Sequence, residues 1–110
     1  MMKKFEDHPS AQAWIYSDEK TGEVMLVSYN TTVCGVTADG WLWCNGTYSR
    51  TTIKHIGWFM RHVAKLYGVR LSYYDAKYCY EKGMLLNVTT GEVVTIDEYN
   101  DAQNKSEAVA

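Results

Sequence analysis

The sequence predicts an α+β fold, in which an antiparallel β-sheet of about five to seven short strands carries one main amphipathic helix over about residues 51–67. Residues 13–44 alternate short apolar runs with polar, glycine-containing loops, which is the pattern of successive hairpins. Residues 53–67 then change to helical spacing. A chain of 110 residues that is 46% hydrophobic and 14% aromatic holds one core, so we expect residues 1–110 to form a single domain.

The first predicted hairpin joins the apolar runs 13–16 and 24–29 through the polar loop 18–22. The chain then reaches the next apolar run through Asn30 and two threonines. A tight primed turn needs positive φ at its central residues, which β-branched threonine resists. We therefore expect one long strand here, bent or bulged near Asn30, in place of two strands joined by a tight turn.

A second hairpin is predicted around Gly40, between the apolar runs 33–36 and 41–44. A three-residue loop with Gly40 in the left-handed conformation places Cys34 directly opposite Cys44. A two-residue turn shifts the register by one residue and separates the two cysteines. The sequence leaves both registers open.

The predicted helix is amphipathic, and it has recognisable ends. Ser49 or Thr51 is placed to cap its first turn, and Gly68 is placed to end it in the left-handed conformation. Apolar side chains recur at spacings of three and four residues: Ile53, Ile56, Met60, Val63 and Tyr67.

The part of the chain after the helix is less regular. Residues 69–73 predict a short strand, and residues 85–88 and 93–96 predict a hairpin around a Thr-Thr-Gly loop. Residues 74–83 fit either a short helix or the edge of a sheet, and the sequence does not decide between them.

Both chain ends, residues 1–11 and 98–110, are expected to fray, the second because it is polar, acidic and poor in apolar anchors. No apolar run has the length of a signal peptide or of a membrane span. Three cysteines without a Cys-x-x-Cys pair indicate neither a disulfide framework nor a zinc site. We therefore expect a cytoplasmic protein in a reducing compartment, with no membrane, metal or cofactor.

The net charge of −2 argues against non-specific phosphate binding by the whole surface, but the charges are unevenly distributed. Residues 50–82 contain seven lysines and arginines against two carboxylates, whereas the segments on either side are acidic. The middle of the chain is therefore the place to look for an anion-binding surface.

No motif of a phosphate loop, a dinucleotide fold or a serine nucleophile elbow occurs, so we predict no enzyme. A small enzyme built on Cys34, Cys44 or His55 would require a thiol and a base in contact, which separated positions do not indicate.

Three sets of residues are candidates for binding. At the helix N-terminus, hydroxyls and an imidazole form a candidate anion site beside their simpler role as caps: Ser49, Thr51, Thr52 and His55. On the helix face away from the apolar stripe, cations surround an outward tryptophan: Arg50, Lys54, Trp58, Arg61 and Lys65. In the second hairpin, Trp41 and Trp43 share one face of their strand, which suggests either a second covering layer or a docking surface.

Two segments, residues 28–33 and 48–56, resemble a family of small uncharacterised proteins found largely in bacteriophages and prophages. The resemblance lies in a Ser-Tyr-x-Thr-x-Val strand followed by a Tyr-Ser-x-Thr-Thr-x-x-His helix start. It covers about residues 24–66 and implies a phage origin in a bacterial host, but no activity and no catalytic residues.

These observations predict a non-enzymatic phage-type accessory protein that binds a host macromolecule, in the first place a host protein. Its sharpest form is inhibition of host defence, as by an anti-CRISPR protein. The alternative is a nucleic-acid-binding regulator that uses the basic and tryptophan-bearing face of the helix. The sequence does not predict an oligomeric state.

Overall fold

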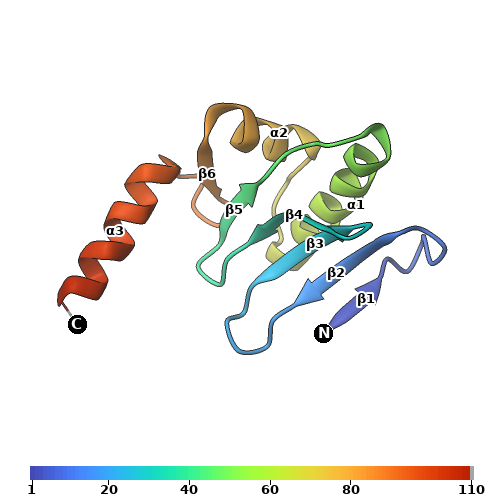
Figure 1. The fold of residues 1–110 in the computed structure, drawn as a ribbon, viewed down its shortest axis with the longest axis horizontal. Helices are drawn as coiled ribbons and strands as arrows, with labels where there is room; N and C mark the ends of the chain where they lie inside the picture. The colour runs from blue at the N-terminus through green and yellow to red at the C-terminus, as the bar shows by residue number, and fades with distance from the viewer. Residues whose placement is uncertain (110) are drawn as a thin grey trace.

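The computed structural model describes residues 1–109, and the side chains of residues 1–104. The described residues form seven strands and three helices, which confirms the predicted α+β class (Figure 1). In chain order these elements are β1 (Met2–Lys4), β2 (Ala13–Ser17), β3 (Val24–Ser28), β4 (Thr31–Val36), β5 (Trp41–Cys44), α1 (Arg50–Tyr67), α2 (Tyr73–Lys82), β6 (Met84–Asn87), β7 (Val93–Thr95) and α3 (Ile96–Val109).

The sheet is antiparallel throughout, and its strands lie in the order in which they occur along the chain. Helices α1 and α2 are inserted between β5 and β6 and pack on the same face, α1 against β3 and α2 against β5 and β6. Helix α3 contacts β6 and β7 and projects away from the rest of the molecule (Figure 1). The other face of the sheet therefore has no helix across its centre.

The core lies between the sheet and the helices α1 and α2. Alternate residues of neighbouring strands point into it, for example Leu26 and Cys34, which are paired and fully buried. The apolar stripe of α1 closes the core from above with Ile56, Phe59 and Met60, each fully buried. Ile56 and Met60 belong to the predicted three-and-four series and Phe59 lies beside it, whereas Ile53 and Tyr67 of that series are half-buried.

The predicted long strand over residues 24–36 is wrong. A two-residue turn, Tyr29 and Asn30, separates β3 from β4, and Ser28 pairs with Thr31. The positive φ that such a turn requires falls on Tyr29, at 56°, and not on a threonine. The irregularity that we expected near Asn30 occurs in β4, where Val33 has no partner and forms a bulge.

Of the two registers that the sequence leaves open, the structure has the one that places Cys34 opposite Cys44. Gly40 has φ at 91°, and the Thr37 amide donates to the Trp41 carbonyl, which closes a three-residue loop. A side chain at position 40 would also meet Thr89 Oγ1 at 2.7 Å. Glycine is therefore required here both by its conformation and by the close approach of the β6–β7 loop.

The expected strand over residues 69–73 is absent, and the ambiguous segment 74–83 belongs to a helix, α2. Ser72 caps this helix, and its side chain forms a capping box with Asp75, which reaches back to the Ser72 amide. Because this cap starts α2 at Tyr73, residues 69–72 are too short an extended segment to add a strand to the sheet. The predicted hairpin of β6 and β7 is confirmed, with Leu85 paired to Val94.

The chain ends also differ from the expectation of frayed segments. Residues 2–4 pair with β2 as an edge strand, and Phe5 is part of the core. Residues 96–109 form helix α3, which begins directly after β7. A short N-terminal segment with one well-placed phenylalanine is thus sufficient to dock.

Gly35, in the middle of β4, allows a tryptophan to lie flat on the sheet. A Cβ at this position would meet Trp43 Cζ2 at 2.7 Å, Met25 Cγ at 2.8 Å and the Val24 carbonyl oxygen at 2.9 Å. The last of these is backbone and cannot move aside. We therefore expect Gly35→Ala to lower the free energy of unfolding by about 1–3 kcal/mol, through overpacking.

Gly57 provides the matched control, because a Cβ there meets nothing within 4 Å. Since Gly57 lies inside α1, Gly57→Ala is expected to raise the free energy of unfolding by about 0.5–1 kcal/mol. Urea denaturation of the two variants measures both effects. Equal stability of Gly35→Ala and the wild type would contradict the close packing described above.

Candidate functional site

Polar side chains of the two motif segments, residues 28–33 and 48–56, form a chain of hydrogen bonds between β3 and α1, called the polar chain below. Ser28 Oγ lies 2.8 Å from His55 Nδ1 and 3.1 Å from Thr52 Oγ1. The Ser49 hydroxyl donates to Thr52 Oγ1 at 3.2 Å and also accepts the Thr52 amide as the helix cap. When Ser49 donates to Thr52, Thr52 donates to Ser28 and Ser28 donates to His55. His55 Nδ1 then accepts the last hydrogen bond of the chain.

This chain of hydrogen bonds requires a neutral imidazole with its proton on the other nitrogen. Burial lowers the pKa of His55, and the nearby Lys54 and His8 lower it further, so the neutral form is favoured. Ser28 and His55 are each only 2% exposed. A serine beside a histidine base is the pair that acyl transfer uses, but this serine hydroxyl is buried. The pair acts here as a link between helix and sheet.

Both tyrosines of the motif segments have left-handed backbone conformations. Tyr29 has φ at 56° and Tyr48 at 58°, and they are the two non-glycine residues with positive φ in the described chain. Each is the direct neighbour of a serine in the polar chain, Ser28 or Ser49, and each ring is about half exposed. A non-glycine residue held at positive φ costs about 1 kcal/mol or more. The hydrogen bonds next to both residues, buried at Ser28 and partly buried at Ser49, offset this strain.

The predicted anion site at the start of α1 does not present its polar groups together. Thr52 and His55 are buried and bonded to Ser28, and Ser49 caps the helix. Among the four predicted residues, Thr51 alone is exposed without a role in this chain of hydrogen bonds. The simpler explanation, capping, accounts for these hydroxyls.

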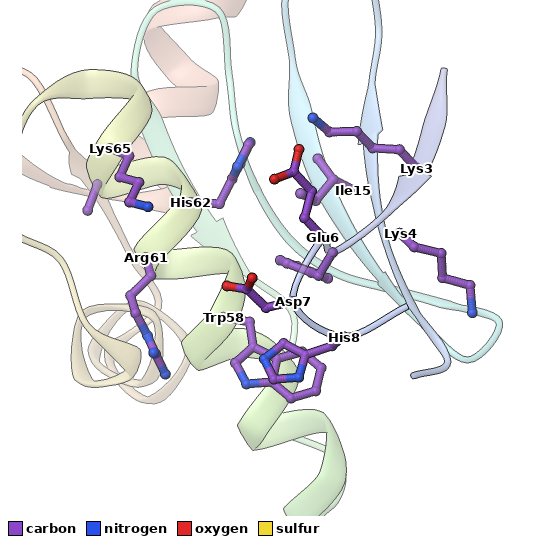
Figure 2. Close-up of a pocket in the computed structure, with 12 residues that line it drawn as sticks. Lys3, Lys4, Glu6, Asp7, His8, Ile15, Trp58, Arg61, His62 and Lys65 are labelled. Carbon is purple, nitrogen blue, oxygen red and sulfur yellow. The ribbon is translucent and has the colours of Figure 1, made fainter. Parts of the chain in front are cut away.

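A groove of about 580 Å³ lies between α1 and the N-terminal segment (Figure 2). Figure 2 shows α1 on one side and the first strands on the other, with the carboxylates of Glu6 and Asp7 directed into the space between them. The charged side chains that line this groove, called the basic groove below, are Lys3, Lys4, Glu6, Asp7, Arg61 and Lys65, with His8 and His62 beside them. Its fixed charges sum to a positive value.

Trp58 lies at the closed end of the basic groove and is not the outward ring that the sequence suggested. His8 stacks on it with ring centroids 3.6 Å apart and planes 3° from parallel, and Phe5 meets it edge-on at 5.8 Å. One ring face is therefore already occupied. The contact comes from the N-terminal segment, which helical spacing cannot reveal.

The structure divides the predicted basic face of α1 into two parts. Arg61 and Lys65 line the basic groove, where Lys3 and Lys4 join them. Arg50 and Lys54 are exposed on the first turns of the helix, outside the groove. The two N-terminal lysines are functional candidates that sequence patterns missed, since nothing in residues 1–11 indicates a strand.

The sheet face opposite α1 and α2 is the second candidate surface, called the open face below. Strand alternation places Trp14 and Tyr16 of β2 on it, and their partners in β3 are Val27 and Met25. Trp41 and Trp43 of β5 lie on the same face, and all six side chains are half-buried. The alternation of side chains along residues 13–17 and 24–28 is the sequence signal that could have identified the four residues of β2 and β3.

Polar contacts hold the tryptophans of the open face in place. Trp43 lies over Gly35, and its indole N–H donates to the Glu23 carboxylate at 3.1 Å. Lys4 Nζ lies 4.4 Å from the centre of the Trp14 ring. Tyr99 of α3 covers an edge of Trp41 with ring centroids 5.9 Å apart. The open face is therefore an ordered aromatic surface, partly covered at its β5 end.

Two further properties bear on function. Within residues 1–104, no three His, Cys, Asp or Glu side chains gather in a way that holds a metal ion. No helix in the described chain is both long and apolar enough to cross a membrane.

Comparison with known proteins gives one match. Residues 4–76 match the model of a family of unknown function, DUF8033. The matched region contains both motif segments and runs from β1 to the first turn of α2. No curated protein and no solved structure matches the chain significantly.

The lowered pKa of His55 predicts how stability depends on pH. Its unfolded pKa is about 6.5, so between this value and the lower folded pKa the unfolded chain binds the extra proton. Folding stability should therefore be complete above pH 6.5 and should fall at lower pH, by at most about 1.4 kcal/mol per pH unit for one histidine. Urea denaturation at a series of pH values measures this dependence.

His62 provides the comparison, because burial, Lys3 and Lys65 lower its pKa as well. His55→Gln and His62→Gln should each remove part of the pH dependence, and the double variant should remove more. An NMR titration of His55 in the wild type gives a direct check. A His55 pKa above 6.5 would disprove the neutral acceptor role.

Proposed function

Because the chain belongs to DUF8033, a family of unknown function, we propose its function from its surfaces: it is a non-enzymatic protein that binds a host protein through the open face of its sheet. The observation that carries this proposal is the aromatic surface formed by β2, β3 and β5, across which no described helix lies. Aromatic side chains and methionine are enriched at protein interfaces, and large apolar patches on a monomer mark binding sites.

The chemistry of the open face favours a partner with an apolar surface. Trp43 and Trp14 are already held by Glu23 and Lys4, so their side chains lose little conformational entropy when a partner docks on them. The Trp43 indole N–H is already bonded to Glu23, while the Tyr16 phenol can donate to a partner. Two charged groups lie among these rings, Lys4 over Trp14 and Glu23 at the Trp43 indole, and a largely apolar docking patch on a folded host protein is the complement.

The resemblance to phage proteins supports a proposal for where the protein acts and on what kind of partner. We propose that the protein is a phage-type accessory protein in the cytoplasm of a bacterial host, where it inhibits host defence as an anti-CRISPR protein does. The support for this extension is the resemblance of residues 28–33 and 48–56 to phage proteins, together with the small acidic domain. The partner is therefore sought among host defence and nucleic-acid-processing proteins.

A test of the protein-binding proposal uses affinity capture from a host lysate. Tyr16→Lys combined with Val27→Lys places two cations on the open face, and we expect at least a tenfold loss of the captured partner, since two charges become buried in an apolar contact. Both side chains are half-buried on the solvent side, and circular dichroism verifies that the variant folds.

Tyr74→Lys combined with Val93→Lys is the matched control, because both residues are exposed and lie outside the open face. It should capture the partner as the wild type does. Equal capture by the Tyr16 and Val27 double variant would refute the open face as the docking site.

A second candidate function is nucleic-acid binding, which the basic groove favours. Lys3 joins Arg61 and Lys65 around one groove, so more phosphates can be contacted than by the helix alone. Lys4 also lines the groove, but its ammonium lies over Trp14 and donates to the Ala11 carbonyl. Trp58 is stacked on His8, so a nucleobase would have to displace His8 to use that ring face.

This candidate predicts an affinity for DNA or RNA that falls steeply as salt is added, with a slope of about 0.9 for each phosphate neutralised. Arg61→Glu combined with Lys65→Glu should abolish the binding, whereas Lys20→Glu combined with Lys82→Glu changes the net charge equally at sites outside the groove. Fluorescence anisotropy with labelled oligonucleotides measures both. No binding at low salt, or equal loss in both variants, would eliminate the candidate.

A further inference from the structure

Cys34 and Cys44 face each other across two neighbouring strands. They form a register pair between β4 and β5, and the three-residue loop that ends at Gly40 fixes this register. Both sulfurs point to the helix-covered side of the sheet, beneath α2, because Cys34 is part of the core and Cys44 packs against it.

The pair occupies the type of strand position at which a cross-strand disulfide fits. The Asn45 amide donates to the Val33 carbonyl on one side of the pair, and the Gly35–Trp43 pair lies on the other. Hydrogen-bonded and non-hydrogen-bonded pairs alternate along an antiparallel ladder, so Cys34 and Cys44 form a non-hydrogen-bonded pair. Opposite Cα atoms are about 4.5 Å apart at such a pair, which is inside the range that a disulfide spans.

The two thiols differ in exposure and in acidity. Cys34 is fully buried, whereas Cys44 is half-buried, and its thiol reaches the Gly46 carbonyl at 3.5 Å. A hydrogen bond from Cys34 lowers the pKa of Cys44, while burial raises the pKa of Cys34. Cys44 is therefore the more exposed thiol and the one that ionises at lower pH, and Cys34 is the thiol that can resolve its oxidised form.

We propose that Cys34 and Cys44 are a redox-active pair that hydrogen peroxide closes into a disulfide between β4 and β5. The Cys44 thiolate attacks one peroxide oxygen, the O–O bond breaks, and hydroxide leaves and takes up a proton to become water. The resulting sulfenic acid is attacked by the Cys34 sulfur, the S–O bond breaks, and a second water leaves with the Cys34 proton. Two thiols are oxidised to one disulfide while one peroxide is reduced to two waters.

The third cysteine is a control that the fold provides. Cys79, in α2, is 1% exposed, and burial raises its pKa to about 11. Cys79 raises the pKa of Cys34 and Cys44 raises the pKa of Cys79, so Cys79 lies near both, but it belongs to a helix and not to the paired strands. The geometry assigns the disulfide to the two strand cysteines and leaves Cys79 reduced.

The test is peroxide treatment of the folded protein, followed by denaturation, thiol counting and peptide mapping by mass spectrometry. The three free thiols should fall to one, with the loss of two hydrogens and a peptide that links Cys34 to Cys44. A reductant should restore all three thiols. The Cys79→Ala variant should form the same linked peptide.

Single variants separate the two roles of the pair. In Cys34→Ala, Cys44 should stop at the sulfenic acid, which dimedone traps, whereas in Cys44→Ala the buried Cys34 should remain a thiol. Circular dichroism confirms the fold of each variant, and the wild-type experiment decides the matter where a variant does not fold. Retention of three thiols in the wild type, or a disulfide that contains Cys79, would overturn the proposal.

Discussion

The hydrogen bond between Ser28 and His55 is the contact on which the arrangement of the molecule depends. It joins the last residue of β3 to the second turn of α1, and Thr52 and Ser49 extend it to the helix cap. A buried polar pair costs free energy unless both partners are satisfied, so it specifies one position of the helix on the sheet. The two strained tyrosines, Tyr29 and Tyr48, are tolerated because this position is fixed.

The position of α1 determines both candidate surfaces. With its start fixed at β3, the helix packs on the middle of one face and leaves the space over β1 and β2 as the basic groove (Figure 2). Helix α2 covers β5 and β6 on the same side, so the six apolar side chains of the open face are left without a helix across them. The family match over residues 4–76 includes the polar chain and the whole groove except Lys3, while β6, β7 and α3 lie outside it.

Much of this fold follows from local patterns, and its exceptions have physical causes. The helix and the Gly40 loop follow from periodicity and from the conformational needs of glycine, whereas the sequence leaves the Cys34–Cys44 register open and the three-residue loop decides it. The turn at Tyr29 could not be predicted, because its positive φ is stabilised by a buried contact with a helix that comes later in the chain.

In the candidate surfaces, too, some residues follow from local sequence patterns and others depend on tertiary contacts. Alternation identifies one face of β5, and with it Trp41 and Trp43, but it cannot tell which face of a sheet the helices leave open. The stacking of His8 on Trp58 joins residues fifty positions apart, so no sequence spacing indicates it. Tertiary contacts of this kind decide whether a tryptophan is a docking residue or part of the core.

A protein partner that docks on the open face covers the side chains there. Oxidative footprinting of the protein, alone and with the captured partner, reports on these side chains one by one. We expect Tyr16, Met25 and Trp43 to become protected by the partner while Tyr74, which is 73% exposed on α2, does not. Protection of Trp58 and His8 in the basic groove, with Tyr16 and Met25 unchanged, would contradict it.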